Sequence, residues 1–149
     1  MRHAHKIGAV FYVLWGVLHM VGGVALLGEL RSGGIAAELA AIADASPADH
    51  FAGLPPTGAI AGILGYYAWL IITIGLVAIL IAVFLNWKHD RFGYWLSLAL
   101  MLPVEIGIYA FLLKPGYMLW SAGGIGMSLF VLGAIFSTIG STRGAPQAT

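Results

Sequence analysis

The chain has 149 residues, of which 60% are hydrophobic and only 9% are charged, and its mean hydropathy is +0.94. A soluble domain needs more charged surface than this, so the composition places the protein in a lipid bilayer. The formal net charge of +1 excludes a strongly basic surface for nucleic acid, and the lack of cysteine excludes disulfides, thiolate metal sites and cysteine nucleophiles.

Four apolar stretches are long enough to cross a membrane, since a spanning helix needs about 20 apolar residues. They cover residues 7–28, 58–85, 92–113 and 117–140. We expect the first to remain as a span, because its apolar core is longer than that of a signal peptide and no clear cleavage site ends it. The sequence therefore predicts an all-α polytopic membrane protein, with a bundle of four transmembrane helices forming one domain over residues 1–149.

The outer loop between the first two spans, residues 29–57, is the longest connection. Within it, Ile35, Leu39 and Ile42 follow the i, i+4, i+7 spacing of one helical face. We therefore expect a short amphipathic helix in this loop, lying across the outer end of the bundle.

The basic residues are unevenly distributed over the connections, and this distribution predicts the orientation. If the amino terminus is inside, the outer loops hold only Arg31 and Lys114. The cytoplasmic segments then hold Arg2, Lys6, Lys88, Arg91 and Arg143. We therefore expect both termini in the cytoplasm, the second as a mobile polar tail over residues 141–149.

Glycine supplies 21 residues, and many of them lie within the spans. Helices in lipid associate through close packing, so small residues mark contact faces. The predicted packing positions are Gly16 and Gly23 in the first span, the GxxxG pair Gly58 and Gly62 in the second, and Gly124 in the fourth. We interpret them as contacts within the bundle rather than as a dedicated dimer face.

Two ionisable side chains lie within the spans at the same predicted depth. His19 interrupts the apolar stretch VLWGVLHMVGG, and Glu105 is the only acidic residue in any predicted span. Counted from residues 7 and 93, each lies 12 positions along its helix, or roughly 18 Å at about 1.5 Å per residue. Other polar side chains fall near this level, and the full set of ligand-binding or proton-relay candidates is His19, Glu105, Tyr66, Tyr67, Tyr109 and Ser128.

The chemistry of this polar layer has two interpretations. An isolated carboxylate is costly in hydrocarbon, so Glu105 must be protonated, paired with His19 or reached by water. Ionisable residues inside membranes commonly serve function, which favours a site; the alternative is that the two side chains only hydrogen-bond two helices together. One His and one Glu make an incomplete metal site, so we predict no metal, with His19 as the one candidate ligand.

The chain contains the stretch VLWGVLHMVGG, a polar outer loop, a proline in the third span and a short Lys-Pro-Gly turn into the fourth. In this arrangement it resembles small bacterial four-helix membrane proteins, including the DoxX-like family. The resemblance covers the hydropathy plan of most of the chain and assigns no site residue. It implies the inner membrane of a bacterium. Because DoxX-like proteins include a subunit associated with quinone-linked thiosulfate oxidation, it also implies a quinone or an electron-transfer partner.

We predict that the polar layer binds a small apolar or amphipathic ligand, within a homo-oligomer or a larger membrane complex. One alternative is a non-catalytic accessory or structural subunit of a membrane complex. Another is a small membrane enzyme that uses His19 and Glu105 as an acid–base pair. The sequence does not decide whether the protein is an enzyme. Quinone and haem are the candidate cofactors. The expected partners are the lipid bilayer, further copies of the protein and other membrane subunits.

Overall fold

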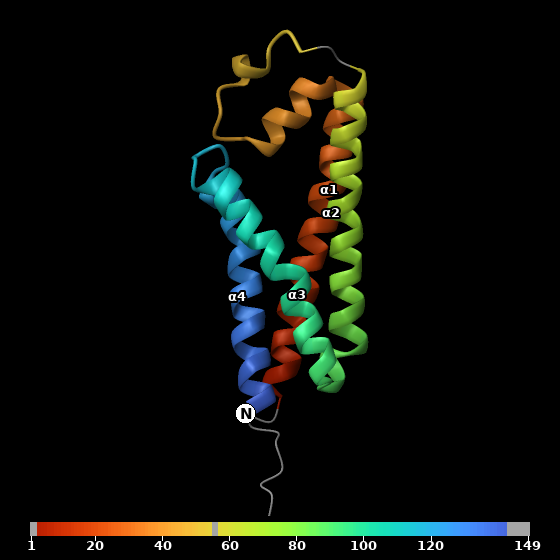
Figure 1. Ribbon diagram of the computed structural model, residues 1–149, viewed down its shortest axis with the longest axis vertical. Coiled ribbons are helices and arrows are strands. Elements are labelled where there is room, and N and C mark those ends of the chain that lie inside the picture. Colours follow the sequence, from red (N-terminus) through yellow and green to blue (C-terminus); the bar gives the residue numbers. More distant parts are fainter. Residues whose placement is uncertain (1–2, 55–56, 143–149) are drawn as a thin grey trace, which may run out of the picture.

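The computed structural model describes residues 3–54 and 57–142, which contain helices and no strand (Figure 1). Arg2, Arg143 and the remainder of the predicted tail lie outside the described residues. The elements, in chain order, are α1 (Ala4–Ile42), the 3-10 turn η1 (Ala48–Phe51), α2 (Ala59–Phe84), the 3-10 turn η2 (Asn86–Lys88), α3 (Arg91–Ile108), the π-helical turn η3 (Tyr109–Leu113) and α4 (Trp120–Thr142).

Four helices in the described part of the chain are long and apolar enough to cross a membrane, which confirms the predicted all-α four-helix bundle. The boundaries differ from the prediction in two places. Helix α1 continues well beyond residue 28, and α4 begins at Trp120 and ends at Thr142, inside the segment predicted as a tail. The protein is therefore an integral membrane protein built from four spanning helices.

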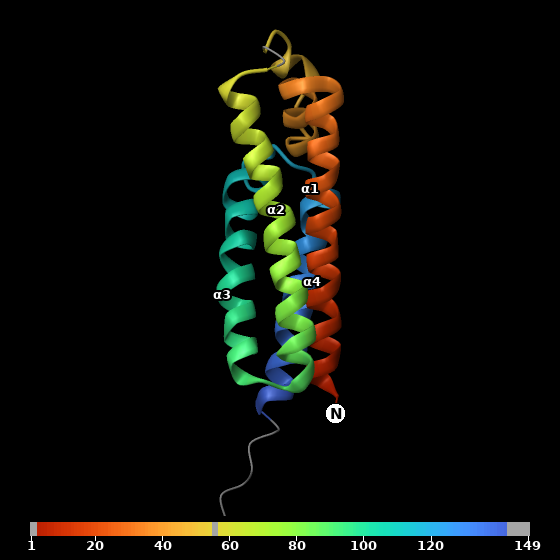
Figure 2. The ribbon, with the colours of Figure 1, turned by 90° about the vertical axis from the view of Figure 1, so that its right-hand side faces the viewer.

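Helix α1 is the central element of the bundle, because it packs along α2 on one side and along α4 on the other. Helix α3 runs obliquely across the view of Figure 1, lies at one side of the bundle in Figure 2, and makes fewer contacts with its neighbours. The start of α1 and the end of α4 lie at the same end of the molecule, which we call the terminal end (Figure 1).

Two of the predicted packing glycines bring the backbones of α1 and α2 together. A Cβ atom added to Gly16 would lie 2.5 Å from the carbonyl oxygen of Gly75, and one added to Gly23 would lie 2.7 Å from that of Ala68. Both distances are far below van der Waals contact. The close approach of α1 and α2 therefore requires glycine at these positions.

The other three predicted packing glycines do not hold the helices of this chain together. A Cβ atom at Gly58 or Gly62 would meet nothing within 4 Å, and one at Gly124 would meet only Trp120 of its own helix. The expectation of contacts within the bundle is therefore wrong for these positions. The physical reason is that spacing places glycines on a common face but does not determine whether that face turns inward.

The second part of α1 folds back across the end of the bundle opposite the termini, and it forms the short helix predicted in the first loop (Figure 1). Gly34 makes this reversal, because its φ of 72° and ψ of −161° belong to a region that only glycine adopts readily. We call residues 35–42 the roof helix and this end of the bundle the roof end. Ile35 and Glu38 are its fully buried side chains, whereas Leu39 is half-buried.

The roof helix is attached at its far end to the turn that precedes α4. The Asp44 carboxylate accepts a hydrogen bond of 2.7 Å from the backbone N–H of Leu119, and the N–H of Ala45 donates to the carbonyl oxygen of Tyr117 over 3.1 Å. Because Leu119 immediately precedes α4, Asp44 caps that helix from a distant part of the chain. The roof is thus fixed at both ends.

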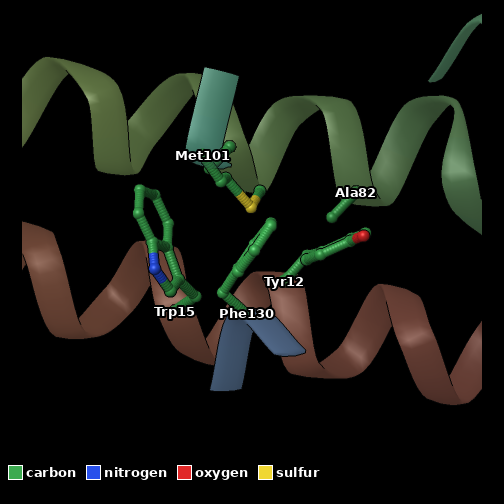
Figure 3. Packing of buried hydrophobic residues seen from close by; sticks show 6 residues of the cluster. Tyr12, Trp15, Ala82, Met101 and Phe130 are labelled. Carbon is green, nitrogen blue, oxygen red and sulfur yellow. The ribbon is translucent and has the colours of Figure 1, made fainter. Parts of the chain in front are cut away.

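A buried cluster contributed by all four spanning helices fills the half of the bundle nearer the termini. Figure 3 shows the packing of its side chains. Its members are Tyr12 and Trp15 of α1, Ala78 and Ala82 of α2, Met101 of α3 and Phe130 of α4. Their side chains interdigitate, so this half of the bundle is closed by packed aromatic and aliphatic groups.

Candidate functional site

A cavity of about 340 Å³ lies in the roof half of the bundle, among all four spanning helices. Ala41 and Ile42 of the roof helix form part of its wall. Most of the lining is aliphatic, and the larger apolar members are Leu18, Leu26, Ile71, Ile108, Leu112 and Met118. The ionisable side chains in the lining are His19, Glu29 and Tyr67, of which Glu29 and Tyr67 are exposed.

His19 lies on the side of the cavity nearer the aromatic cluster, and its ring is held by Trp15 one helical turn earlier. The two rings stack with centroids 3.7 Å apart and planes inclined by 27°. The ring nitrogen Nδ1 is 2.9 Å from the carbonyl oxygen of Trp15. The spacing of four residues places both groups on the same side of α1, so the helix itself orients the histidine.

Glu105 lies directly behind this pair and is only 3% exposed. The indole Nε1–H of Trp15 donates a hydrogen bond of 2.5 Å to its Oε1 atom. The other oxygen, Oε2, is buried and has no hydrogen-bond partner among the described residues. Trp15 therefore connects the two ionisable side chains, contacting the imidazole with its ring face and the carboxyl with its N–H group.

Gly126 of α4 provides the space in which His19 and Glu105 approach each other. A Cβ atom at this position would lie 3.3 Å from Oε1 of Glu105 and 3.5 Å from Cε1 of His19. The two side chains form no hydrogen bond with each other in the structure, although both lie next to Gly126 of α4. A larger residue at Gly126 would separate them.

The remaining predicted site residues divide into two groups. Tyr67 lines the cavity with His19. Tyr66 is 63% exposed, Tyr109 is 44% exposed, and the exposed Ser128 hydroxyl donates to the carbonyl oxygen of Gly124 in its own helix. The structure thus places His19 and Tyr67 in the cavity wall, with Tyr67 36% exposed, and Glu105 beside His19 but outside the lining; the other three lie on the outer surface.

Sequence reasoning missed two residues that the structure brings into prominence. Trp15 is fully buried and is the hydrogen-bond partner of Glu105. The sequence signal for it was a tryptophan four residues before a histidine, because an indole N–H inside a membrane needs an acceptor. Glu38 is fully buried in the roof helix, and neither of its carboxyl oxygens has a partner among the described residues. Its position three residues after Ile35 places it on the inner face of that helix.

A second set of polar contacts lies at the terminal end and connects helices. Asn86 Nδ2 donates to Ser97 Oγ over 2.7 Å, and Nε2 of His89 lies 3.0 Å from the carbonyl oxygen of Gly140. The rings of His5 and His89 have centroids 4.8 Å apart. These contacts join the turn between α2 and α3 to α1 and α4.

A metal ion at His19 would need further ligands from neighbouring side chains. Over residues 3–54 and 57–142, no group of three or more His, Cys, Asp or Glu side chains is placed to hold a metal ion. The site that remains is an apolar cavity with a histidine at its inner end and a buried carboxyl behind that histidine.

These features define the class of the protein: a polytopic helical membrane protein with a cavity between its spans. Comparison of the chain with family models, with curated proteins and with solved structures finds no match in any of the three.

Proposed function

We propose that the protein binds a small amphipathic molecule in the cavity beneath the roof helix, with the polar group of that molecule at His19. The observation that carries the proposal is the chemical asymmetry of the cavity. Its walls are mainly aliphatic, and the imidazole of His19 lies at the end nearest the aromatic cluster. Such a lining favours a ligand with an apolar body and one polar end.

The size of the cavity supports this proposal. Ligand pockets for small organic molecules commonly enclose about 300–1,000 Å³, and the volume of about 340 Å³ lies at the lower end of that range. Burial of an apolar body is worth about 25 cal/mol per Å² of apolar surface when the molecule comes from water. A molecule that comes from the bilayer gains little from this term, so selection then depends on fit and on the contact with His19.

The orientation and the cellular location form part of the same proposal. The excess of Lys and Arg in the connections at the terminal end favours both termini in the cytoplasm, which places the cavity towards the outer leaflet. The resemblance to DoxX-like proteins favours the inner membrane of a bacterium. Under this proposal a quinone is one candidate ligand, whereas haem would need His19 as an axial ligand.

A second candidate function is that of an accessory subunit in an oligomer or a larger membrane complex. The observation in its favour is that Gly58, Gly62 and Gly124 have no close contact with another helix of this chain. Small residues on a lipid-facing surface allow a further helix to approach closely. The two candidates are compatible, since ligand binding and assembly use different surfaces.

The geometry does not favour acid–base catalysis by His19 and Glu105. His19 and Glu105 share no hydrogen bond, and Trp15 lies against both of them. Glu105 is 3% exposed and is not part of the cavity lining. A bound molecule would therefore meet the histidine and not the carboxyl.

Native mass spectrometry of the protein in native-lipid nanodiscs tests the proposal, with Gly22→Leu as the main variant. Gly22 lines the cavity, and a Cβ atom there would meet nothing within 4 Å, so leucine fills the cavity without disturbing the packing. Gly62→Leu is the matched control, because Gly62 also faces open space but lies outside the cavity. The expected result is a bound mass per chain that is present in the native protein and in Gly62→Leu and lost in Gly22→Leu.

Two results would contradict the proposal. One is the absence of any bound mass in the native protein. The other is a bound mass that Gly22→Leu leaves unchanged, which would place the molecule elsewhere on the protein. Loss of a partner polypeptide in Gly62→Leu alone would support the accessory-subunit function.

A further inference from the structure

The hydrogen bond between His19 and the backbone determines which ring nitrogen carries the proton. A backbone carbonyl oxygen can only accept, so Nδ1, which lies 2.9 Å from the carbonyl oxygen of Trp15, must be the donor. A neutral imidazole has one N–H group and one nitrogen with a free lone pair. In the neutral ring of His19, Nε2 is therefore the nitrogen with the lone pair.

Nε2 is also the nitrogen that remains available. In the described part of the chain Nε2 has no hydrogen-bond partner. It is also not one of the unpartnered polar atoms that are fully buried, so a ligand can reach it. His19 lines the cavity, whose other large members are aliphatic apart from Tyr67. An apolar surrounding favours the uncharged ring, because a charged group without a partner is costly there.

The surrounding side chains keep the ring in this state. Stacking on Trp15 restricts rotation of the imidazole, and the hydrogen bond from Trp15 to Glu105 holds the indole in place. Trp15 is fully buried and is not part of the cavity lining, so it acts as a positioning residue and not as a ligand contact. The cavity thus presents one fixed hydrogen-bond acceptor at its inner end.

We propose that the ligand is a hydroxyl-bearing amphipathic molecule whose O–H group donates a hydrogen bond to Nε2 of His19, an inference that rests on the proposed ligand-binding function. The polarity of the site selects the head group. An alcohol or a phenol matches the lone pair, whereas an ether, ester or ketone of the same size places its own lone pairs against it. The aliphatic wall accommodates the chain or ring that carries the hydroxyl group.

Two isomeric probes test the inference, because 1-decanol and methyl nonyl ether have the same atoms and differ in whether they have a donor. Binding to the protein in lipid nanodiscs is followed by the nitrogen-15 resonances of labelled histidine side chains, with those of His19 assigned from the His19→Phe variant. Phenylalanine keeps a ring for stacking on Trp15 and removes Nε2. His50→Phe is the matched control, since His50 is exposed and lies outside the cavity.

The expected spectrum without probe shows His19 protonated at Nδ1 and unprotonated at Nε2. Decanol is expected to move the Nε2 resonance and to bind roughly two- to tenfold more tightly than the ether, the range that one hydrogen bond contributes. The preference is expected to persist in His50→Phe and to disappear in His19→Phe, in which both isomers bind equally.

The outcomes separate this inference from the proposed function. Equal binding of the two isomers to the native protein, with the site still blocked by Gly22→Leu, would overturn the inference and leave the ligand-binding function in place. A spectrum with the proton of His19 on Nε2 would overturn it as well. If neither isomer binds and the native protein also retains no bound mass, the proposed function fails and the inference fails with it.

Discussion

The hydrogen bond between Trp15 and Glu105 gives a quantitative prediction. Trp15→Phe keeps an aromatic ring beside His19 but removes the only partner of the Glu105 carboxyl among the described residues. In a soluble core, an unsatisfied buried polar group costs about 1–3 kcal/mol. In membrane proteins, interhelical hydrogen bonds measured by double-mutant cycles average about 0.6 kcal/mol with a maximum near 1.7 kcal/mol, because the unfolded chain in the membrane also finds partners.

We therefore expect a coupling free energy of about 0.6–1.7 kcal/mol between positions 15 and 105. The upper part of this range is favoured, since Trp15 is fully buried and Glu105 is 3% exposed, so water cannot replace the lost partner without local opening. The loss of volume in Trp15→Phe adds a separate packing cost. A double-mutant cycle removes that cost from the comparison.

The assay is reversible unfolding in mixed micelles, applied to Trp15→Phe, Glu105→Met and the double variant. Trp15→Phe is expected to cost less in the Glu105→Met background than in the native one, by the coupling free energy. Glu105→Gln is the control, because its amide oxygen still accepts from the indole and should preserve most of the stability. An equal cost of Trp15→Phe in both backgrounds would refute the assigned hydrogen bond.

Three further variants test the packing and the roof. Gly16→Ala should destabilise the fold by about 1–3 kcal/mol, since the added Cβ would lie 2.5 Å from a backbone oxygen of α2, whereas Gly62→Ala should have little effect; unfolding free energies of the two will check this difference. Gly34→Ala should cost about 1–3 kcal/mol through backbone strain and should raise hydrogen exchange in the roof helix, and unchanged exchange would contradict the role of Gly34 in reversing the chain. Asp44→Ala should cost about 0.5–2 kcal/mol through loss of the cap at Leu119, and Asp44→Asn, which can still accept, should restore most of it if the cap is real.

The fold was predictable from sequence because its signals are local. Each span is an uninterrupted apolar stretch of sufficient length, and lipid permits such a stretch few structures other than a helix. The roof helix was also predictable, since the spacing of Ile35 and Ile42 within a polar loop indicates an amphipathic helix. The reversal at Gly34 was not, because glycine occurs in many ordinary helical positions of this chain and its φ angle follows from tertiary contacts.

The depth of the site residues along their helices was predictable, but the side of the helix on which each residue lies was not. A constant rise per residue placed His19 and Glu105 at one level, and the structure shows both side chains next to Gly126. The same calculation included Tyr66 and Tyr109, which lie on the outer surface, because helix rise does not determine how a helix is rotated about its axis. Aromatic residues are favourable on either side of a membrane helix, so their type gave no further indication.

The position of the aromatic cluster restricts how molecules enter and leave. On each of the four helices, the cluster residues lie closer to the terminal end than the residues that line the cavity. The cavity beneath the roof helix is therefore closed on the side of the aromatic cluster and does not continue through the bundle. Under the proposed function, a molecule in this cavity exchanges with one leaflet, and passage to the other leaflet would require displacement of α3, the least firmly packed span. The proposed ligand would therefore be drawn from one face of the membrane.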